Sequence, residues 1–562
     1  VAAVYAVTKD RQLDNWMDTA IAVIAAAQKA DGYIYTKNII GQRKTGAQKM
    51  FDDKLSFEAY NFGHLMTAAC IHHRATGKTS LLEVARKAAD FLIGFYATAT
   101  PEQARNAICP SHYMGLTELY RTTQDKRYLN LVVKLIDVRG TVEGTDDNSD
   151  RAPVRDMQKV VGHAVRANYL FAGVADVFAE TGDSTLFRTL GKVWDNVVHT
   201  KMYVTGGCGA LYDGVSVDGT SYLPDTVQKV HQAYGRDFQL PNFSAHNETC
   251  ANIGNMLWNW RMFLVTGEAK YMDVLELALY NSVLSGVSMD GSKFFYTNPL
   301  AASANYPYHL RWEGGRIPYI SKSNCCPPNT VRTIAEVSDY MYSMGEDGLY
   351  VNLYGGNRFS DKWSDGSPVK LEQTSNYPWN GKVTFKIEEA PADNFAVFLR
   401  IPGWCKKYTL SINGKMQQGD VIAGYHALRR SWKTGDHIEL FLDMPVTLIE
   451  SNPFVEETRN QVAVKRGPVV YCLESTDQPG LNVFDVLIPA NINLATSPGK
   501  IADGNVMKLT GTGQRVQHSN WQGTLYREVN TTTKPVNITF IPYYAWANRG
   551  KSDMTVWMPL TR

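Results

Sequence analysis

The hydrophobic pattern of this chain changes its period once, and that change limits the folds it can adopt. Up to about residue 345, apolar residues recur at the 3.6-residue spacing of amphipathic helices. After Gly348 they alternate with polar residues, most clearly at 383–389, 395–401, 408–413 and 437–443. A chain of 562 residues is also too long for one hydrophobic core. We therefore expect a multidomain protein, mainly α and then β.

The helical part carries a recurrent turn between helices, at residues 74–82, 121–129, 179–187 and 264–272. In each copy a Thr ends one helix, a Gly or Gln follows where a left-handed C-cap is needed, and an apolar pair starts the next helix. The intervals are irregular, at about 47, 58 and 85 residues. This favours a closed α/α barrel with inserted loops, over residues 1–345, rather than an open solenoid.

The alternating part divides into two blocks. Strand patterns separated by Pro-Gly and Asn-Gly turns predict an antiparallel β-sandwich over 346–450. Further strand patterns at 461–472, 536–542 and 554–558 predict a second, smaller antiparallel β-sandwich over 451–562.

Composition and charge argue against several classes of protein. A net charge of +2 without basic runs argues against nucleic acid as a partner. No stretch approaches the roughly 18 to 20 apolar residues of a membrane helix, so we expect no membrane span. The chain starts at Val1 inside a helix-like pattern, and we expect that a preceding segment, with any export signal, has been cleaved or omitted.

Eight cysteines are few for a disulfide scaffold of this size, and four soft or acidic ligands are grouped in two short segments. Glu248 and Cys250 precede one helical pattern, and Cys325 and Cys326 precede another. Helix N-termini favour anions and lower cysteine pKa values, and three thiolates with one carboxylate would complete a tetrahedral zinc site. Each pattern alone is equally typical of a buried pair or of a disulfide. A metal held by so unusual a set would have a catalytic task.

Three histidines occupy comparable positions in successive helical hairpins. His64, His112 and His163 each lie at or near the start of a helical pattern, after a small or helix-breaking residue. A single one would more often be a buried core histidine. Three together would converge on the barrel axis, where the hydroxyl groups of a sugar need donors and acceptors.

These segments, with several others, resemble glycoside hydrolase family 127, the β-L-arabinofuranosidase family, and its sister family 146. The motifs that carry the resemblance are Glu248-Thr-Cys250-Ala, Asn324-Cys-Cys-Pro-Pro-Asn329, Gly162-His-Ala-Val-Arg166, Ala278-Leu-Tyr-Asn281, Leu399-Arg-Ile-Pro-Gly-Trp404 and Val464-Lys-Arg-Gly-Pro-Val-Val-Tyr-Cys472. Together they cover nearly the whole chain.

The resemblance implies an (α/α)6 barrel catalytic domain followed by two β-sandwich domains. It implies retaining exo-hydrolysis that releases a terminal furanose from plant cell-wall oligosaccharides or polysaccharides, with Cys325 as nucleophile. Zn2+ would be held by Glu248, Cys250, Cys325 and Cys326. The implied sugar contacts are His64, His112, His163, Glu276 and Tyr296. A periplasmic or secreted bacterial enzyme is expected, and a homodimer is compatible with the sequence.

One catalytic position departs from the family. The resemblance places the general acid and base on a Glu about 16 residues before the metal-binding Glu, and this chain has Gln232 there. An amide cannot transfer a proton. His231, Asp237 or Glu276 could replace the acid, or the substrate could bring its own. The long segment between Cys208 and His231 is a second departure, expected to reshape the mouth of the pocket.

Gln232 also has a meaning for the substrate. A carboxylate would repel a sugar that carries a carboxyl group, whereas an amide can donate a hydrogen bond to it. The resemblance includes relatives that remove aceric acid, a carboxylated furanose, from pectin. A carboxylated furanose is therefore an expected substrate beside β-L-arabinofuranose.

Two other functions stay open at this point. A polysaccharide lyase could use the same combination of α/α barrel and β-sandwich, although it would not need three cysteines around a metal. A non-catalytic, zinc-containing carbohydrate-binding protein is the other alternative, because Gln232 has replaced the expected acid.

Overall fold

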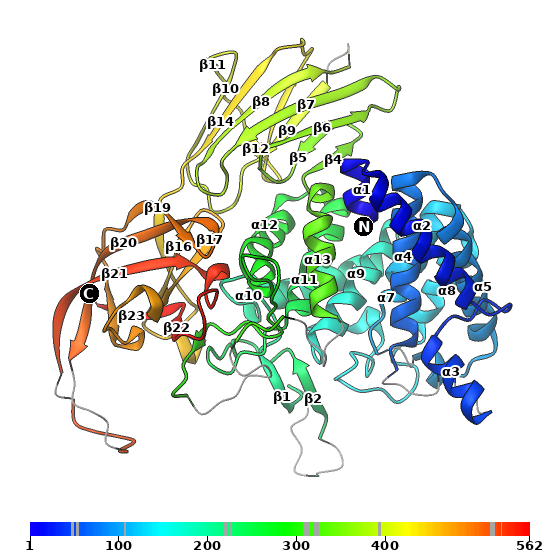
Figure 1. Ribbon diagram of the computed structural model, residues 1–562, viewed down its shortest axis with the longest axis horizontal. Coiled ribbons are helices and arrows are strands. Elements are labelled where there is room, and N and C mark those ends of the chain that lie inside the picture. Colours follow the sequence, from blue (N-terminus) through cyan, green and yellow to red (C-terminus); the bar gives the residue numbers. More distant parts are fainter. Residues whose placement is uncertain are drawn as a thin grey trace.

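The structure is a computed structural model in which helices precede strands along the chain (Figure 1). It describes residues 1–46, 50–51, 56–105, 108–217, 223, 227–306, 315–318, 325–391, 395–517, 523–529 and 531–561. The helices occupy one side of the molecule, and the strands form two separate bodies beside them. The predicted order of a helical domain followed by sandwich-like β domains is confirmed.

The helical domain has an inner and an outer layer, because buried helices alternate with amphipathic ones. The inner helices are α4 (Glu58–Thr76), α7 (Ser111–Thr123), α9 (Ala164–Thr181), α11 (Thr249–Thr266) and α13 (Cys326–Ala335). The outer helices are α2 (Arg11–Ala27), α5 (Ser80–Thr98), α8 (Lys126–Asp137), α10 (Ser184–Thr200) and α12 (Ala269–Ala278). Helix α9 is buried from Ala164 to Val177, as expected for a helix covered on all sides.

Helix α1 (Ala2–Thr8) lies between the last and the first of these inner helices. Lys9 Nζ donates to the carbonyl of Ala75 on α4, and the charge of Arg332 on α13 acts on His64 of α4. The inner helices therefore form a closed ring. Two short helices, α3 (Thr36–Thr45) and α6 (Pro101–Arg105), lie in connections.

The predicted turns between helices have the expected backbone. Gly77, Gln124, Gly182 and Gly267 end α4, α7, α9 and α11 in the left-handed conformation, with φ of 74°, 59°, 67° and 69°. Each cap N–H donates to a carbonyl of the preceding turn. The sequence-based assignment of these helix ends is confirmed.

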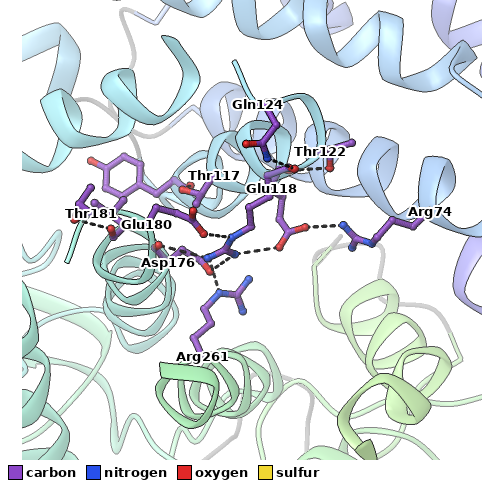
Figure 2. A network of polar contacts seen from close by, with 12 residues as sticks. Arg74, Thr117, Glu118, Thr122, Gln124, Asp176, Glu180, Thr181 and Arg261 are labelled. Atoms are coloured by element: carbon purple, nitrogen blue, oxygen red, sulfur yellow. Dashed lines mark hydrogen bonds and ion pairs between the residues drawn. The ribbon is translucent and has the colours of Figure 1, made fainter. Parts of the chain in front are cut away.

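At the C-terminal ends of the inner helices, an ionic network connects four of them (Figure 2). Arg74 on α4 binds Glu118 on α7 at 2.8 Å. Arg121 on α7 and Arg261 on α11 bind Asp176 on α9, at 2.8 and 2.6 Å. This network occupies one end of the barrel. The helix N-termini lie at the opposite end, where a functional site can form.

The middle domain is a sandwich of a six-stranded sheet, in the order β11-β10-β14-β8-β7-β6, and a five-stranded sheet, β12-β13-β9-β5-β4. Its apolar core includes Phe385, Val397 and Leu440. All pairs are antiparallel except β5 with β9. The strands are β4 (Tyr342–Gly345), β5 (Gly348–Val351), β6 (Asn357–Lys362), β7 (Pro368–Ser375), β8 (Lys382–Glu389), β9 (Phe395–Arg400), β10 (Tyr408–Ile412), β11 (Lys415–Met416), β12 (Val421–Ile422), β13 (Tyr425–Arg430) and β14 (His437–Leu442).

The C-terminal domain departs in detail from a simple sandwich, because its hydrogen bonding closes on itself. The order β16-β23-β18-β20-β21-β17 returns to β16, and β18 pairs with β23 in parallel. The strands are β15 (Val446–Glu450), β16 (Gln461–Arg466), β17 (Val469–Glu474), β18 (Val486–Pro489), β19 (Ala495–Ile501), β20 (Gly504–Gln517), β21 (Thr532–Pro542), β22 (Met554–Thr555) and β23 (Trp557–Thr561). Strand β3 (Ala301–Ala302), from the helical part of the chain, joins this sheet through β22.

Both faces of the C-terminal sheet are covered, which explains its sequence. Val462 and Val464 point into the closed interior, whereas Ala463 packs with Trp546 and Phe295 against the helical domain. Strand β17 is therefore buried at every position and reads as a continuous apolar run rather than an alternation. No helix of the described ranges is long and apolar enough to cross a membrane.

Candidate active site

The candidate site lies where the N-termini of the inner helices meet. His163 is the N-cap of α9, Glu248 the N-cap of α11, and Cys325 the N-cap of α13. His112 is the second residue of α7, and His64 lies in the second turn of α4. The repeated hairpin thus brings residues from five distant segments to one end of the barrel, where helix dipoles favour anionic groups.

The four predicted metal ligands form one cluster at this end of the barrel. One ligand atom from each of Glu248, Cys250, Cys325 and Cys326 lies within 4.8 Å of all the others. Cys250 Sγ is 3.3 Å from Cys326 Sγ, and Cys325 Sγ is 3.8 Å from Cys326 Sγ. Glu248 Oε1 lies 3.5 and 3.8 Å from the sulfurs of Cys326 and Cys325.

These separations fit a tetrahedral cation. Ligands at the Zn–S distance of about 2.3 Å stand about 3.8 Å apart along the edges of a tetrahedron. Burial raises the pKa of Glu248, and it raises the pKa values of Cys250 and Cys326 well above their usual range. Burial therefore disfavours the charged forms of these side chains, and a divalent cation would favour them. The donor set therefore fits zinc.

Local sequence explains how the cluster is held. Pro327 lies in the first turn of α13, where its missing N–H costs no hydrogen bond, and it stiffens the segment after Cys326. Asn329, one turn further along, donates from Nδ2 to Cys250 Sγ at 3.2 Å. Asn329 of α13 thereby orients Cys250 of α11. Asn329 is part of the sequence motif, but its role could not be predicted from the motif.

Cys325 differs from the other ligands in its exposure. Glu248, Cys250 and Cys326 are buried, whereas Cys325 is only half-buried. It also lies close enough to His64 and Tyr60 to influence their pKa values. Within the cluster, Cys325 is the most exposed of the three thiols.

Gln232 connects two of the predicted sugar contacts. Its Oε1 is 3.0 Å from His163 Nε2 and accepts a hydrogen bond from the Tyr296 hydroxyl at 3.3 Å. Its backbone is left-handed, with φ of 50°, which is uncommon for a residue other than glycine and turns the end of β2 (Lys229–Ala233). An amide whose oxygen accepts from two donors directs its NH2 group away from them.

Of the three predicted histidines, His112 and His163 are buried and His64 is partly buried, and all three have lowered pKa values. Burial lowers the pKa of His64 and of His112 to about 3. Burial, reinforced by the charge of Arg166, lowers the pKa of His163 well below its usual range. These rings can exchange hydrogen bonds with hydroxyl groups, but they cannot serve as proton donors near neutral pH.

Glu276 occupies a different place from the one that the resemblance implies. It lies on the outer helix α12, and its carboxylate is bound by three residues of the middle domain. Arg400 forms a buried ion pair with it, the Tyr377 hydroxyl donates to it at 2.6 Å, and Trp404 Nε1 donates at 3.2 Å. The structure gives this carboxylate a role in joining two domains and does not bring it together with the histidines.

The structure gives the two further candidates for the missing acid, Asp237 and His231, different surroundings. Asp237 accepts hydrogen bonds from Asn196 and Thr200 at the end of α10. His231 lies on β2 beside Gln232, with Nδ1 3.0 Å from Asp147 Oδ1. Asp147 was not identified from the sequence, since nothing in its local pattern marks it.

The segment between Cys208 and His231 is partly described. Strands β1 (Leu211–Val215) and β2 pair as an antiparallel hairpin that carries His231 and Gln232 on its second strand (Figure 1). Residues 218–222 and 224–226 lie outside the described ranges. The expected effect of this segment on the mouth of the pocket stays a prediction.

The barrel carries one buried glutamate, three cysteines and three histidines at its helix N-termini, and the comparisons show that a chain of this kind is a glycoside hydrolase. Family models match the chain in three parts: the β-L-arabinofuranosidase GH127 catalytic domain at 1–339, the GH127 middle domain at 348–444 and the family 127 C-terminal domain at 446–559. The chain belongs to glycoside hydrolase family 127.

Similar proteins agree with this assignment. A non-reducing end β-L-arabinofuranosidase of Bifidobacterium longum subsp. longum is 31% identical, over 97% of this chain and 85% of its own. A solved structure described as a glycoside hydrolase is 54% identical with a TM-score of 0.94, over 100% of this chain and 90% of its own. A GH127 β-L-arabinofuranosidase of Geobacillus stearothermophilus T6 is 33% identical with a TM-score of 0.88, over 100% and 88%. Neither a lyase nor a non-catalytic protein is favoured by these matches.

Proposed function

We propose that this enzyme is a retaining exo-furanosidase that uses a zinc-bound cysteine to release a terminal carboxylated furanose from plant pectic glycans. The names of both relatives state that they are β-L-arabinofuranosidases, and the name of the Bifidobacterium protein adds that it acts at the non-reducing end. The observation that carries the finer proposal is that a partly exposed Cys325 occurs together with Gln232, an amide beside His163 at the position expected for the acid. Export to the periplasm or the outside of the cell suits such a substrate.

The metal part of the proposal rests on the donor set. Glu248, Cys250, Cys325 and Cys326 would hold zinc, which would keep thiolates ionised at neutral pH and make a thiolate a better leaving group. Cys325 is proposed as the nucleophile because it is the half-buried member of the set. Its thiolate would attack the anomeric carbon and form a thioglycosyl intermediate, and water would then release the sugar with retained configuration.

The sugar would be held by neutral groups around this cysteine. His64, His112 and His163 offer ring nitrogens that are not charged, and the Tyr296 hydroxyl lies beside Gln232. Neutral donors and acceptors suit the hydroxyl groups of a furanose, because binding then removes no charged group from water.

Gln232 supports a carboxylated substrate through electrostatics. Two unit charges about 4 Å apart repel each other by about 1 kcal/mol in water and about 4 kcal/mol near a protein surface. A glutamate at this position would impose that repulsion on a sugar carboxylate. The amide removes it and adds an N–H donor.

The test is sugar release from a matched pair of substrates, a β-L-arabinofuranoside and the same furanoside carrying a carboxyl group. We expect the parent enzyme to prefer the carboxylated compound by at least about tenfold in kcat/KM, and Gln232→Glu to shift that ratio towards the plain sugar. Cys325→Ala should release neither sugar, while Cys405→Ala, which removes a thiol of the middle domain, should act as the parent does.

Each part of the proposal has its own contrary result. Full activity of the parent on the plain furanoside alone would remove the carboxylated substrate. Activity of Cys325→Ala close to that of the parent would remove the nucleophile.

A further inference from the structure

We infer that His231, oriented by Asp147, is the general acid and base that replaces the carboxylic acid missing at Gln232. The inference rests on the proposed function as a retaining hydrolase, since such an enzyme must protonate the leaving oxygen and later activate water. It concerns the proton path and makes no use of the metal.

Position is the first argument. His231 directly precedes Gln232 on β2, with the His231 side chain exposed and the Gln232 side chain buried. The rings of His231 and His163 are 5.1 Å apart and nearly perpendicular, and His163 Nε2 in turn lies 3.0 Å from Gln232 Oε1. His231 therefore lies beside the amide that stands where the acid is missing.

Its exposure suits the task. The side chain of His231 is 48% exposed, whereas those of His163 and Gln232 are buried. A furanose held among buried groups would direct its leaving oxygen towards the rim, because the rest of the glycan must remain outside. A proton donor for that oxygen belongs at the rim.

Asp147 gives His231 the arrangement of an oriented catalytic histidine. Asp147 Oδ1 accepts from the backbone N–H of His231 at 2.9 Å and lies 3.0 Å from its Nδ1. Asp147 Oδ2 accepts from Arg166 at 2.7 Å. A hydrogen bond donated by Nδ1–H to the ionised carboxylate fixes the ring and leaves Nε2 to exchange protons with substrate.

The charges around this pair keep Asp147 ionised. Burial alone would raise the pKa of Asp147, but the hydrogen bond from the His231 ring and the charge of Arg166 lower it to about 2. The charged groups around the ring of His231 are Asp147, Asp213, which is its cross-strand neighbour on β1, and Arg166, which pairs with Asp147. His163 is neutral and adds no charge.

The other candidates are occupied. Glu276 is held by Arg400 between two domains, and Asp237 accepts from α10. Desolvation lowers the pKa values of His64 and His112 to about 3, so neither ring carries a proton to donate near neutral pH. Among these groups, His231 combines a carboxylate partner with access to solvent.

The proton balance of the reaction closes on His231. As Cys325 Sγ bonds to the anomeric carbon and the glycosidic C–O bond breaks, the proton on Nε2 moves to the departing oxygen. Neutral His231 then takes a proton from water as the water oxygen bonds to the anomeric carbon and the C–S bond breaks. The histidine ends protonated and Cys325 ends as a thiolate.

The experiment compares His231→Gln with the parent on two furanosides of the same sugar, one with an alkyl or glycan leaving group and one with an activated aryl leaving group that departs without protonation. We expect kcat/KM on the first to fall by about 100-fold or more, and the rate of bond cleavage on the second to change by less than about tenfold. The limb of the pH–rate profile that reports the acid should vanish. His199→Gln, an exposed histidine of α10, is the matched control and should behave as the parent does.

Asp147→Asn tests the positioning role and should shift that limb to lower pH, because the ring loses its carboxylate. An equal loss on both leaving groups, or an unchanged pH profile in His231→Gln, would overturn the inference. The two leaving groups test the proton donor even if the proposed nucleophile is wrong, because the dependence of the rate on the leaving group depends on the proton donor. The activity of Cys325→Ala tests the nucleophile separately.

Discussion

Residue chemistry at the cluster depends on whether a cation is present. Buried thiols and a buried carboxyl group prefer their neutral forms, as the raised pKa values of Cys250, Cys326 and Glu248 indicate. A divalent ion reverses this preference, so metal binding and the reactivity of Cys325 are coupled.

We therefore expect one zinc ion per chain, and loss of activity when it is removed by a chelator. The apo protein should recover activity on addition of zinc. Elemental analysis beside activity measurements checks this, with Cys250→Ser expected to lower both metal content and rate. An active enzyme that contains no metal would contradict the zinc assignment.

Several residue assignments could be made from the sequence, and their success has a physical reason. The motifs around Cys250 and Cys325 lie directly before helices, so their side chains are placed by helix N-termini that local pattern predicts. Asp147 could not be found, because it lies in a loop and meets His231 only through the tertiary fold, 84 residues away in the chain. The contacts of Glu276 with Arg400 and Tyr377 could not be predicted, because a motif gives a residue's identity but not the direction in which its helix faces, and its sugar contact stays a prediction.

At the scale of elements, the two ends of the inner helices have different roles, one in the site and one in holding the helices together. The N-terminal ends present site residues, and the C-terminal ends are joined by the network of Arg74, Glu118, Arg121, Asp176 and Arg261 (Figure 2). Asp176 is the centre of this network, since its nearly inaccessible carboxylate pairs with two arginines from different helices.

Asp176→Asn should destabilise the protein by about 3–5 kcal/mol, because it leaves two partly buried guanidinium groups without their shared counter-ion. Denaturant unfolding followed by helical circular dichroism measures this. Asp195→Asn, at an exposed carboxylate of α10, is the control and should change stability by less than about 0.5 kcal/mol. Equal stability of the two variants would show that the network is not needed.

The ends of helices could be predicted where residues next to them in the sequence determine the backbone conformation. The Thr-Gly and Thr-Gln turns require a left-handed residue, and all four have one. The closure of the C-terminal sheet and the entry of β3 into it were not predictable, because pairing between strands distant in sequence leaves no local signal.

For the whole molecule, the interface between the barrel and the middle domain centres on a buried charge. Arg400 is fully buried and pairs with both Asp273 and Glu276. A guanidinium in such surroundings needs its carboxylates, so this contact holds the two domains in a fixed relation.

Glu276→Gln should therefore lower the thermal unfolding midpoint while leaving KM for the sugar close to that of the parent. The comparison of KM with unfolding temperature separates a domain-joining role from a sugar contact. A large increase in KM without loss of stability would instead support the sugar contact that the family resemblance implies.

The central claim is that Cys325 forms the bond to the sugar, and it is tested most directly by locating a covalent adduct. The enzyme is incubated with an epoxide analogue of the furanose, digested, and mapped by mass spectrometry, with the zinc-loaded protein used throughout. The account predicts one adduct per chain on the peptide that contains Cys325, and none in Cys325→Ala. An adduct on a carboxylate, or full inactivation of the enzyme with Cys325 unmodified, would contradict it.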